Sequence, residues 1–469
     1  MPHQQPARAP GARRPSSAAA ALLVALLGAV SAGCVSLTPP PATHSLAGAS
    51  SAPASAAAAV VPDRTVAPVA SIAPVVTGSP VTAPPASTPD PAAATPALIA
   101  QQDPGMMTPE IAARLQSIID EWRRVAQVPG VVAAIRMPDG TVWTGASGKA
   151  IVGEGNAKAT PDTPWVIGSI TKTFVAALAF QLQQEGTLSL DDPISTWLPD
   201  YPNGAAISLR MLLNHTSGIG DYFWHPDYKT LVFDRPTHQW TVDEILALAA
   251  ARAPLFRPGA DQEYSNTNYI LAGRILESAG GAPLAQQLRS RFFDPLGLTS
   301  VVLQGDEPVP DGAAKGYWRD GGWLDWSDGT TLRPSTSAAT VVWAAGALLA
   351  SVTDLLRWEA ALYGGEILSP DSLAQLLTFG ESGYGPGTRY QRLAGWDGYG
   401  HGGSLRGFNA GMYRMPEAGV DVIAMTNRGD LTVDMTLLVA DLVKASVGRK
   451  PGTGPAATPE PLPSVVPAG

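Results

Sequence analysis

The 469-residue sequence contains one cysteine, only seven lysines and no run of basic residues in its middle part. A single cysteine excludes an intramolecular disulfide and any metal site built from several thiolates. The formal net charge is −9. Because binding to nucleic acid needs a clustered basic surface, we expect no nucleic-acid partner.

The apolar run near the N-terminus, Ala18 to Val30, is too short to span a bilayer, which takes about 20 residues. It follows three arginines and is typical of a signal peptide. The sequence "VSAGC" at its end resembles a bacterial lipobox, in which Cys34 becomes the lipidated first residue. We therefore predict that residues 1–34 are a lipoprotein-type signal peptide. The protein would be exported to the cell envelope and anchored by Cys34 to the outer face of the cytoplasmic membrane.

The small residues before Cys34 also fit ordinary signal cleavage, so secretion as a soluble protein is the alternative. Membrane attachment is expected through the lipid on Cys34 alone.

Charged and aromatic residues are nearly absent from residues 35–106, which consist mainly of Ala, Pro, Ser, Thr and Val. Such a composition cannot bury enough apolar area to offset the entropy lost on ordering, so we predict a disordered stalk. Residues 448–469 have a similar composition, which predicts a disordered tail. One folded unit remains, residues 107–447.

Hydrophobic periodicity predicts the elements of this unit. A helix is expected after Thr108, then two strands around the turn 138–140, then an apolar helix that begins at Pro164. Several helices fill the middle. Two strands around the turn 416–419 and a last helix at 431–446 end the unit. Since strands lie at both ends, we predict an α+β fold. Its antiparallel sheet would be built from N- and C-terminal strands with flanking helices, and a mainly helical lobe would be inserted between them.

A lysine stands inside the apolar helix, three residues after a serine. Ser169 and Lys172 are nearly one helical turn apart, so their side chains share a face. A serine hydroxyl needs an adjacent base to act as a nucleophile. A free lysine has a pKa of about 10.4, and burial lowers it. The pair therefore predicts a serine nucleophile activated by a buried lysine; the alternative is a lysine on a solvated helix face.

Two further motifs follow along the chain. Tyr264-Ser265-Asn266 stands in a polar turn before a helix, and His401-Gly402-Gly403 stands where we expect a strand to start. The order Ser-x-x-Lys, Tyr-x-Asn and a Lys- or His-led triplet ending in Gly is a three-part catalytic signature. With these motifs and stretches such as "LRMLLNHTSGIGDY", residues 107–447 resemble the serine β-lactamase and penicillin-binding protein superfamily. The resemblance is to the branch of class C β-lactamases, D-alanyl-D-alanine carboxypeptidases and related esterases.

The resemblance implies that the fold is β-lactamase/transpeptidase-like and that Ser169 is acylated by the substrate. Lys172 and Tyr264 would transfer protons, and Asn266 would hydrogen-bond the substrate and the lysine. His215, in the sequence "NHTSG", would belong to a structural turn. The family needs no metal or organic cofactor, and we expect none.

The resemblance also assigns roles to the third motif. His401 would support the tyrosine electrostatically, where many relatives have lysine. Gly403 and Ser404 would line the substrate site, with the backbone N–H groups of Ser169 and Ser404 forming the oxyanion hole.

This third motif departs from the carboxypeptidase pattern, in which threonines hold the terminal carboxylate of the substrate. Gly402 and Ser404 stand at those positions. Because side chains alternate along a strand, Arg406 would share their face, and we expect its guanidinium to bind the carboxylate with two hydrogen bonds. The alternative is that Arg406 points to solvent.

Several functions stay open from the sequence. The substrate would be a small peptide, an ester or a β-lactam, with cell-wall peptidoglycan as a candidate partner. We favour a D-alanyl-D-alanine carboxypeptidase-like peptidase; an esterase, an amidase or a β-lactamase is the alternative within the family. A non-catalytic wall-binding sensor is a further alternative, against which the intact Ser169, Lys172 and Tyr264 argue. The loop with Trp318, Trp323 and Trp326 either folds on its own rings or walls the cleft.

Overall fold

The computed structural model describes residues 105–153, 155–250, 252–317, 336–405, 407–429 and 434–451, all within one compact unit. Several predicted features lie outside the described residues: Cys34 with its signal peptide, most of the stalk and tail, Arg406, and the loop of Trp318, Trp323 and Trp326. Among the described helices, none combines the length and the apolar character that crossing a membrane requires.

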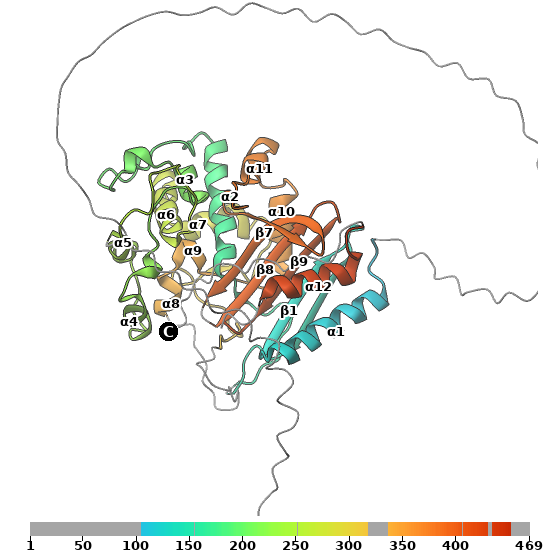
Figure 1. Ribbon diagram of the computed structural model, residues 1–469. Coiled ribbons are helices and arrows are strands. Elements are labelled where there is room, and N and C mark those ends of the chain that lie inside the picture. The colour runs from blue at the N-terminus through green and yellow to red at the C-terminus, as the bar shows by residue number, and fades with distance from the viewer. Residues whose placement is uncertain are drawn as a thin grey trace, which may run out of the picture. The chain divides into compact units, whose positions relative to one another are not determined.

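A six-stranded antiparallel sheet joins the two ends of the folded unit. Its strand order is β2-β1-β9-β8-β7-β6, so the N-terminal hairpin pairs directly with the C-terminal strands, cyan and orange-red in Figure 1. The strands are β1 (Gly130–Arg136), β2 (Val142–Gly148), β6 (Arg389–Leu393), β7 (Trp396–Leu405), β8 (Phe408–Met415) and β9 (Val420–Thr426). This topology confirms the predicted α+β fold.

Helices cover both faces of the sheet, and β1 shows why. Val131 and Ala133 contact one apolar core, whereas the alternate residues Val132 and Ala134 contact the other. The first core lies under α1 and α12, which pack side by side, and the second contains α10 and the helical lobe. The longer helices are α1 (Pro109–Ala126), α2 (Thr171–Gln184), α5 (Val242–Ala250), α6 (Asn266–Gly280), α10 (Val352–Tyr363) and α12 (Met435–Val447).

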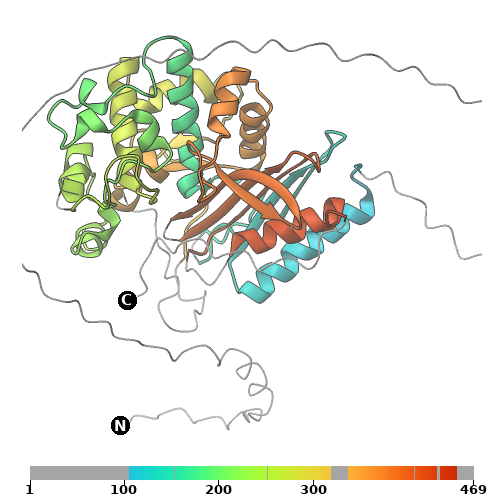
Figure 2. The same cartoon turned by 45° about the horizontal axis from the view of Figure 1, so that its top comes forward.

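The described residues between β2 and β6 contain the predicted helical lobe, whose helices run from green through yellow to orange in Figure 2. Its shorter helices are α3 (Leu209–Leu213), α4 (Tyr228–Phe233), α7 (Leu284–Leu288), α8 (Thr336–Thr340), α9 (Trp343–Gly346) and α11 (Pro370–Leu376). A second sheet, of order β3-β5-β4, lies beside it. Its strands are β3 (Trp165–Val166), β4 (Val302–Leu303) and β5 (Leu348–Ala350).

The expectation of a helix from Pro164 is therefore wrong for its first residues. Trp165 and Val166 pair with β5, a 3-10 turn follows at Gly168–Ile170, and α2 begins at Thr171. Strands of two or three residues leave no periodic pattern, which is why the sequence did not reveal them.

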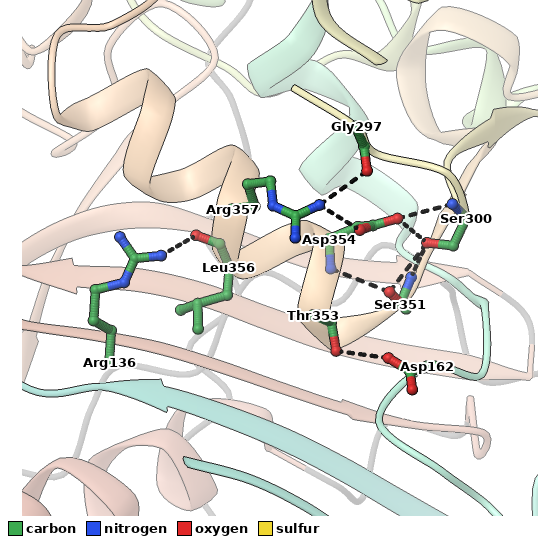
Figure 3. Close-up of polar contacts among 9 residues, drawn as sticks. All are labelled: Arg136, Asp162, Gly297, Ser300, Ser351, Thr353, Asp354, Leu356 and Arg357. Atoms are coloured by element: carbon green, nitrogen blue, oxygen red, sulfur yellow. Dashed lines mark hydrogen bonds and ion pairs between the residues drawn. The ribbon is translucent and has the colours of Figure 1, made fainter. Parts of the chain in front are cut away.

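The start of α10 is fastened to both outer strands of this small sheet (Figure 3). Ser351 caps the helix by accepting from the Asp354 N–H at 3.1 Å. The Asp354 carboxylate accepts from the backbone N–H and the hydroxyl of Ser300, at 2.8 and 2.7 Å. Thr353 donates to Asp162 at 3.0 Å. Since Ser300 precedes β4 and Asp162 precedes β3, these contacts hold the strands on either side of β5.

The position of His401 also differs from the expectation. Strand β7 begins at Trp396, so His401 lies inside the strand rather than at its start. The stretch "DGYGHGG" has low β-propensity, but β6 and β8 pair with its two edges. At Gly400 a side chain would not fit, because a Cβ would lie 1.9 Å from the carbonyl oxygen of Met412.

Glu359 of α10 is fully buried against the sheet, at 0% exposure. Neither of its carboxyl oxygens has a hydrogen-bond partner among the described residues. Burial raises its pKa well above the ordinary value and Asp421 adds to this, while Arg414 and Arg136 act in the opposite direction. The carboxyl group therefore keeps its proton in the folded state at pH values where the unfolded chain loses it.

We predict that replacing this group changes how stability depends on pH. The folded pKa of Glu359 is raised, so its contribution is fully present below about pH 4.3 and is lost as pH rises toward the folded value. The free energy of unfolding of Glu359→Gln, relative to that of wild type, should therefore increase as the pH rises from 5 to 8, by up to about 1.4 kcal/mol per pH unit. Urea unfolding at both pH values measures this. The exposed Glu366→Gln is the control, and a pH-independent difference for Glu359→Gln would contradict the assignment.

Candidate active site

The structure brings Ser169, Lys172 and Tyr264 into direct contact. The Nζ atom of Lys172 lies 3.1 Å from the Oγ atom of Ser169, and the hydroxyl of Tyr264 donates to the same oxygen at 2.9 Å. Ser169 stands in the 3-10 turn and Lys172 in the first turn of α2. The three-residue spacing thus places both on one continuous helical turn, and Tyr264 reaches them from just before α6.

Lys172 is completely buried, at 0% exposure. Its Nζ also donates to the Oδ1 of Asn266 at 2.9 Å and to the carbonyl oxygen of Ala345 at 2.6 Å. A neutral amine has two N–H bonds and one lone pair. When the two carbonyl oxygens accept both N–H bonds, the lone pair is left facing the hydroxyl of Ser169.

The charge state of Lys172 fits this arrangement. Burial lowers its pKa to about 7, while the negative charge of Asp221 acts in the opposite direction. A lysine with this pKa is neutral in a large fraction of molecules at physiological pH. It can therefore accept the serine proton, as a general base must.

Asp221 is a site residue that the sequence motifs did not reveal. It is 5% exposed, and its Oδ2 accepts from the backbone N–H and from the side-chain amide of Asn266, at 3.0 and 2.8 Å. Because the amide nitrogen is held there, the carbonyl end of Asn266 turns to Lys172. This confirms the expected contact between Asn266 and the lysine. The signal for Asp221 in the sequence is that it is the one charged residue in the stretch "TSGIGDYFW".

His215 positions Tyr264 by hydrogen bonds to the residues on either side of that tyrosine in the chain. The backbone oxygen of His215 accepts from the Glu263 N–H at 3.1 Å, and its Nδ1 accepts from the Ser265 N–H at 3.2 Å. The imidazole and phenol rings are in contact, with centroids 4.3 Å apart. Burial lowers the pKa of His215 well below its usual value, so the ring is neutral. The predicted turn therefore also orients a reacting group.

Tyr264 is a neutral hydrogen-bond donor. Burial raises its pKa above the usual value, and the hydrogen bond to Ser169 and the charge of Arg389 offset part of this rise. A neutral phenol cannot accept the serine proton, whereas the lone pair of neutral Lys172 can. The phenol is placed to give a proton to a leaving group.

The role expected for His401 is not what the structure indicates. Its Nε2 lies 2.8 Å from the hydroxyl of Tyr384, its Nδ1 hydrogen-bonds to the carbonyl oxygen of Gly402, and its ring centroid is 6.5 Å from that of Tyr264. Burial lowers the pKa of His401 to about 3. A neutral imidazole supplies no positive charge to Tyr264. The nearby cation is Arg389 of β6, whose guanidinium lies 5.7 Å from the Tyr384 ring centroid.

Sequence motifs did not point to Tyr384 and Arg389, which stand in "YGPGTR". They reach the site because β6 pairs with β7 next to His401.

The expected oxyanion hole rests on close backbone contact between the 3-10 turn and β7. A Cβ on Gly403 would lie 1.8 Å from the carbonyl oxygen of Ile167, and a Cβ on Gly168 would lie 2.8 Å from the backbone nitrogen of Ser404. Glycine at both positions lets the segments that carry the N–H groups of Ser169 and Ser404 approach each other. Gly168 also has a φ of 53°, which favours glycine.

Known proteins match this chain over the same region. The family model described as Beta-lactamase matches residues 115–443. Esterase EstB of Burkholderia gladioli is 28% identical over 305 residues, a match that covers 60% of this chain and 77% of EstB. The teichoic acid D-alanine hydrolase of Staphylococcus aureus is 27% identical over 238 residues, covering 50% of this chain and 55% of the hydrolase. The chain thus spans about half the length of that relative.

One solved structure is similar to a larger part of this chain than these two relatives are. The crystal structure of a D-stereospecific amidohydrolase from Streptomyces sp. has a TM-score of 0.60 and 30% sequence identity, and the match covers 73% of this chain and 99% of that one.

The neutral form of Lys172 leads to a prediction about the pH dependence of kcat/KM. Because only the neutral amine can accept the serine proton, kcat/KM for an uncharged aryl ester should rise with pH and level off above an apparent pKa of about 7. A pH profile of ester hydrolysis measures this, with the Lys172→Ala rate subtracted at each pH. A profile whose acidic limb lies near pH 10 would contradict a lowered lysine pKa.

A second prediction concerns His215 as a positioning residue. The backbone of His215 is left-handed, with a φ of 63°. His215→Asn keeps a residue that tolerates this conformation but removes the ring, so we expect kcat/KM to fall by about 10-fold. If the loss acts through Tyr264, most of it should disappear in a Tyr264→Phe background, while the loss of thermal stability should persist. A double-mutant cycle with paired melting curves measures both. Losses in kcat/KM that multiply independently would show that His215 does not act through Tyr264.

Proposed function

The chain belongs to the β-lactamase family of serine hydrolases, and from this premise we propose that it cleaves small amides or esters of D-amino acids through an acyl-enzyme on Ser169. The observation that carries the proposal is the pair of contacts at the serine oxygen. Lys172 at 3.1 Å accepts its proton, and Tyr264 at 2.9 Å holds a proton for the leaving group.

The reaction follows from these contacts. The hydroxyl proton of Ser169 moves to the lone pair of Lys172 while Oγ attacks the carbonyl carbon of the substrate. Negative charge on the carbonyl oxygen is stabilised by the backbone N–H groups of Ser169 and Ser404. The bond to the leaving group breaks as Tyr264 protonates that group. Water then attacks the acyl-enzyme and gives one proton to Tyr264, while its OH group joins the acyl carbon. As the bond to Oγ breaks, Ser169 recovers its proton from Lys172, so that the acid is released and all three side chains return to their starting states.

The choice of substrate class rests on the relatives and on the third motif. One relative is a D-stereospecific amidohydrolase and another is a teichoic acid D-alanine hydrolase, which supports a D-amino acid as part of the substrate. The carboxypeptidase alternative depends on Arg406 as the carboxylate anchor, and that residue lies outside the described part of the chain. We therefore rank amide and ester hydrolysis above carboxypeptidase activity. Export to the cell envelope, as proposed from the Cys34 motif, would bring the protein to D-alanyl substrates.

We predict that a fluorescent fluorophosphonate labels the folded protein at Ser169, because this hydroxyl alone is paired with a neutral buried amine among the described contacts. Peptide mapping identifies the labelled residue. Ser169→Ala should lose labelling and turnover, whereas Ser117→Ala, on the exposed side of α1, should retain both. Labelling at another serine would overturn the assignment.

The rates of wild type on several substrates distinguish the candidate functions. Wild type should release ammonia from D-alanine amide faster than from L-alanine amide, and faster than it releases D-alanine from a peptide ending in D-Ala-D-Ala. A faster reaction with the peptide would favour the carboxypeptidase, and a faster reaction with a chromogenic cephalosporin would favour a β-lactamase.

A further inference from the structure

A pocket of about 370 Å³ opens beside Tyr264, and the mechanism above makes no use of it. One part of its wall is apolar and consists of Trp224, Leu255 and Phe256. Trp224 and Leu255 are 45% and 48% exposed, which is high for large apolar side chains. Such a wall can hold the carbon chain of a small ligand, and the volume lies at the lower end of the range for such sites, about 300–1,000 Å³.

The rest of the wall is charged, and negative charge prevails there. Asp261 and Glu263 present exposed carboxylates, and neither forms an ion pair with any described residue. The cation of the wall is Arg252, whose Nη1 donates to the carbonyl oxygen of Trp224 at 3.0 Å. The buried Asp221 also belongs to the wall, and its carboxylate accepts a hydrogen bond from the side-chain amide of Asn266. A ligand in this pocket therefore meets two carboxylates beside an apolar surface.

The pocket is close enough to the nucleophile to hold part of a substrate. Tyr264 belongs to its wall, and the hydroxyl of the same residue donates to Ser169 Oγ at 2.9 Å. Glu263 precedes Tyr264 in the chain, and its backbone N–H is bound to His215. A group in the pocket is thus separated from the reacting bond by one ordered side chain.

We propose that this pocket is a subsite for the positively charged end of the substrate. A primary ammonium group would face Asp261 and Glu263, and the carbon chain that carries it would lie against Trp224 and Leu255. The inference rests on the proposed acylation of Ser169 and adds a preference for substrates in which a carbon chain ends in a free ammonium. Substrates that present a carboxylate at this end would be repelled by the two acidic side chains.

A series of esters with equal chain length tests the charge preference. The p-nitrophenyl esters of 6-aminohexanoate, heptanoate and adipate place a cation, a methyl group and an anion at the same distance from the ester. Wild type should hydrolyse the cationic ester with a kcat/KM about fivefold above the neutral one, as expected for partly solvated charge pairs, and the anionic ester most slowly. Equal rates for the cationic and neutral esters, or a preference for the anion, would overturn the subsite.

Substitution of the carboxylates locates the preference. In the double variant Asp261→Asn/Glu263→Gln the ratio of the cationic to the neutral kcat/KM should fall close to one. Asp200→Asn, an exposed neutralisation elsewhere, should keep the wild-type ratio. An unchanged ratio in the double variant would place the cation at another site and reject the inference.

Binding without turnover distinguishes a wrong subsite from a wrong reaction. Ser169→Ala protein carrying 5-fluorotryptophan can be titrated with hexylamine, hexanol and hexanoate, and the resonance of Trp224 is identified by its loss in Trp224→Phe. The subsite predicts tightest binding by hexylamine with a shift of the Trp224 signal, whether or not any ester is hydrolysed. No shift with hexylamine would overturn the subsite, whereas ester hydrolysis that persists in Ser169→Ala would overturn the proposed reaction.

Discussion

The site depends on one buried amine. Lys172 lies at 0% exposure with two carbonyl oxygens as acceptors of its N–H bonds. Removing a charged amine from water is costly, and the neutral form avoids that cost. The same burial that makes the lysine unfavourable as a cation makes it useful as a base. The surrounding elements can be understood by what they contribute to this environment: α6 supplies Asn266, and α9 supplies the carbonyl of Ala345.

A second constraint is the contact of the two lobes at the nucleophile. The 3-10 turn that carries Ser169 belongs to the inserted lobe, and it packs on β7 of the large sheet with glycine on both sides of the contact. Strands from both ends of the chain build that sheet. In the proposed reaction, the sheet therefore provides the N–H of Ser404, and the helical lobe provides the proton-transfer groups Lys172 and Tyr264. The proposed reaction at Ser169 therefore requires the sheet and the helical lobe to keep these relative positions.

The sequence predicted the parts of this site that lie close together in the chain or belong to an ordered motif. Ser169 and Lys172 share a helical turn, and Tyr264 with Asn266 forms a short motif, so their association could be expected. Contacts that depend on the tertiary fold could not be predicted in this way. Asp221 reaches Asn266 across 45 residues, and Tyr384 reaches His401 through a hairpin whose first strand is not apparent in the sequence. The electrostatic support expected from His401 is a related case, because a motif identifies a residue type but not the burial that lowers its pKa.

In the folded protein Lys172 should titrate near pH 7, so that a large fraction of this amine is neutral at physiological pH. The most direct measurement is an NMR titration of protein labelled with ¹³C and ¹⁵N lysine, in which the seven lysines report their side-chain pKa values one by one. One resonance should titrate at about 7, and this resonance should be absent in Lys172→Ala. If the resonance assigned to Lys172 titrated near the free value of about 10.4, the lysine would be a cation at neutral pH and could not be the base for Ser169.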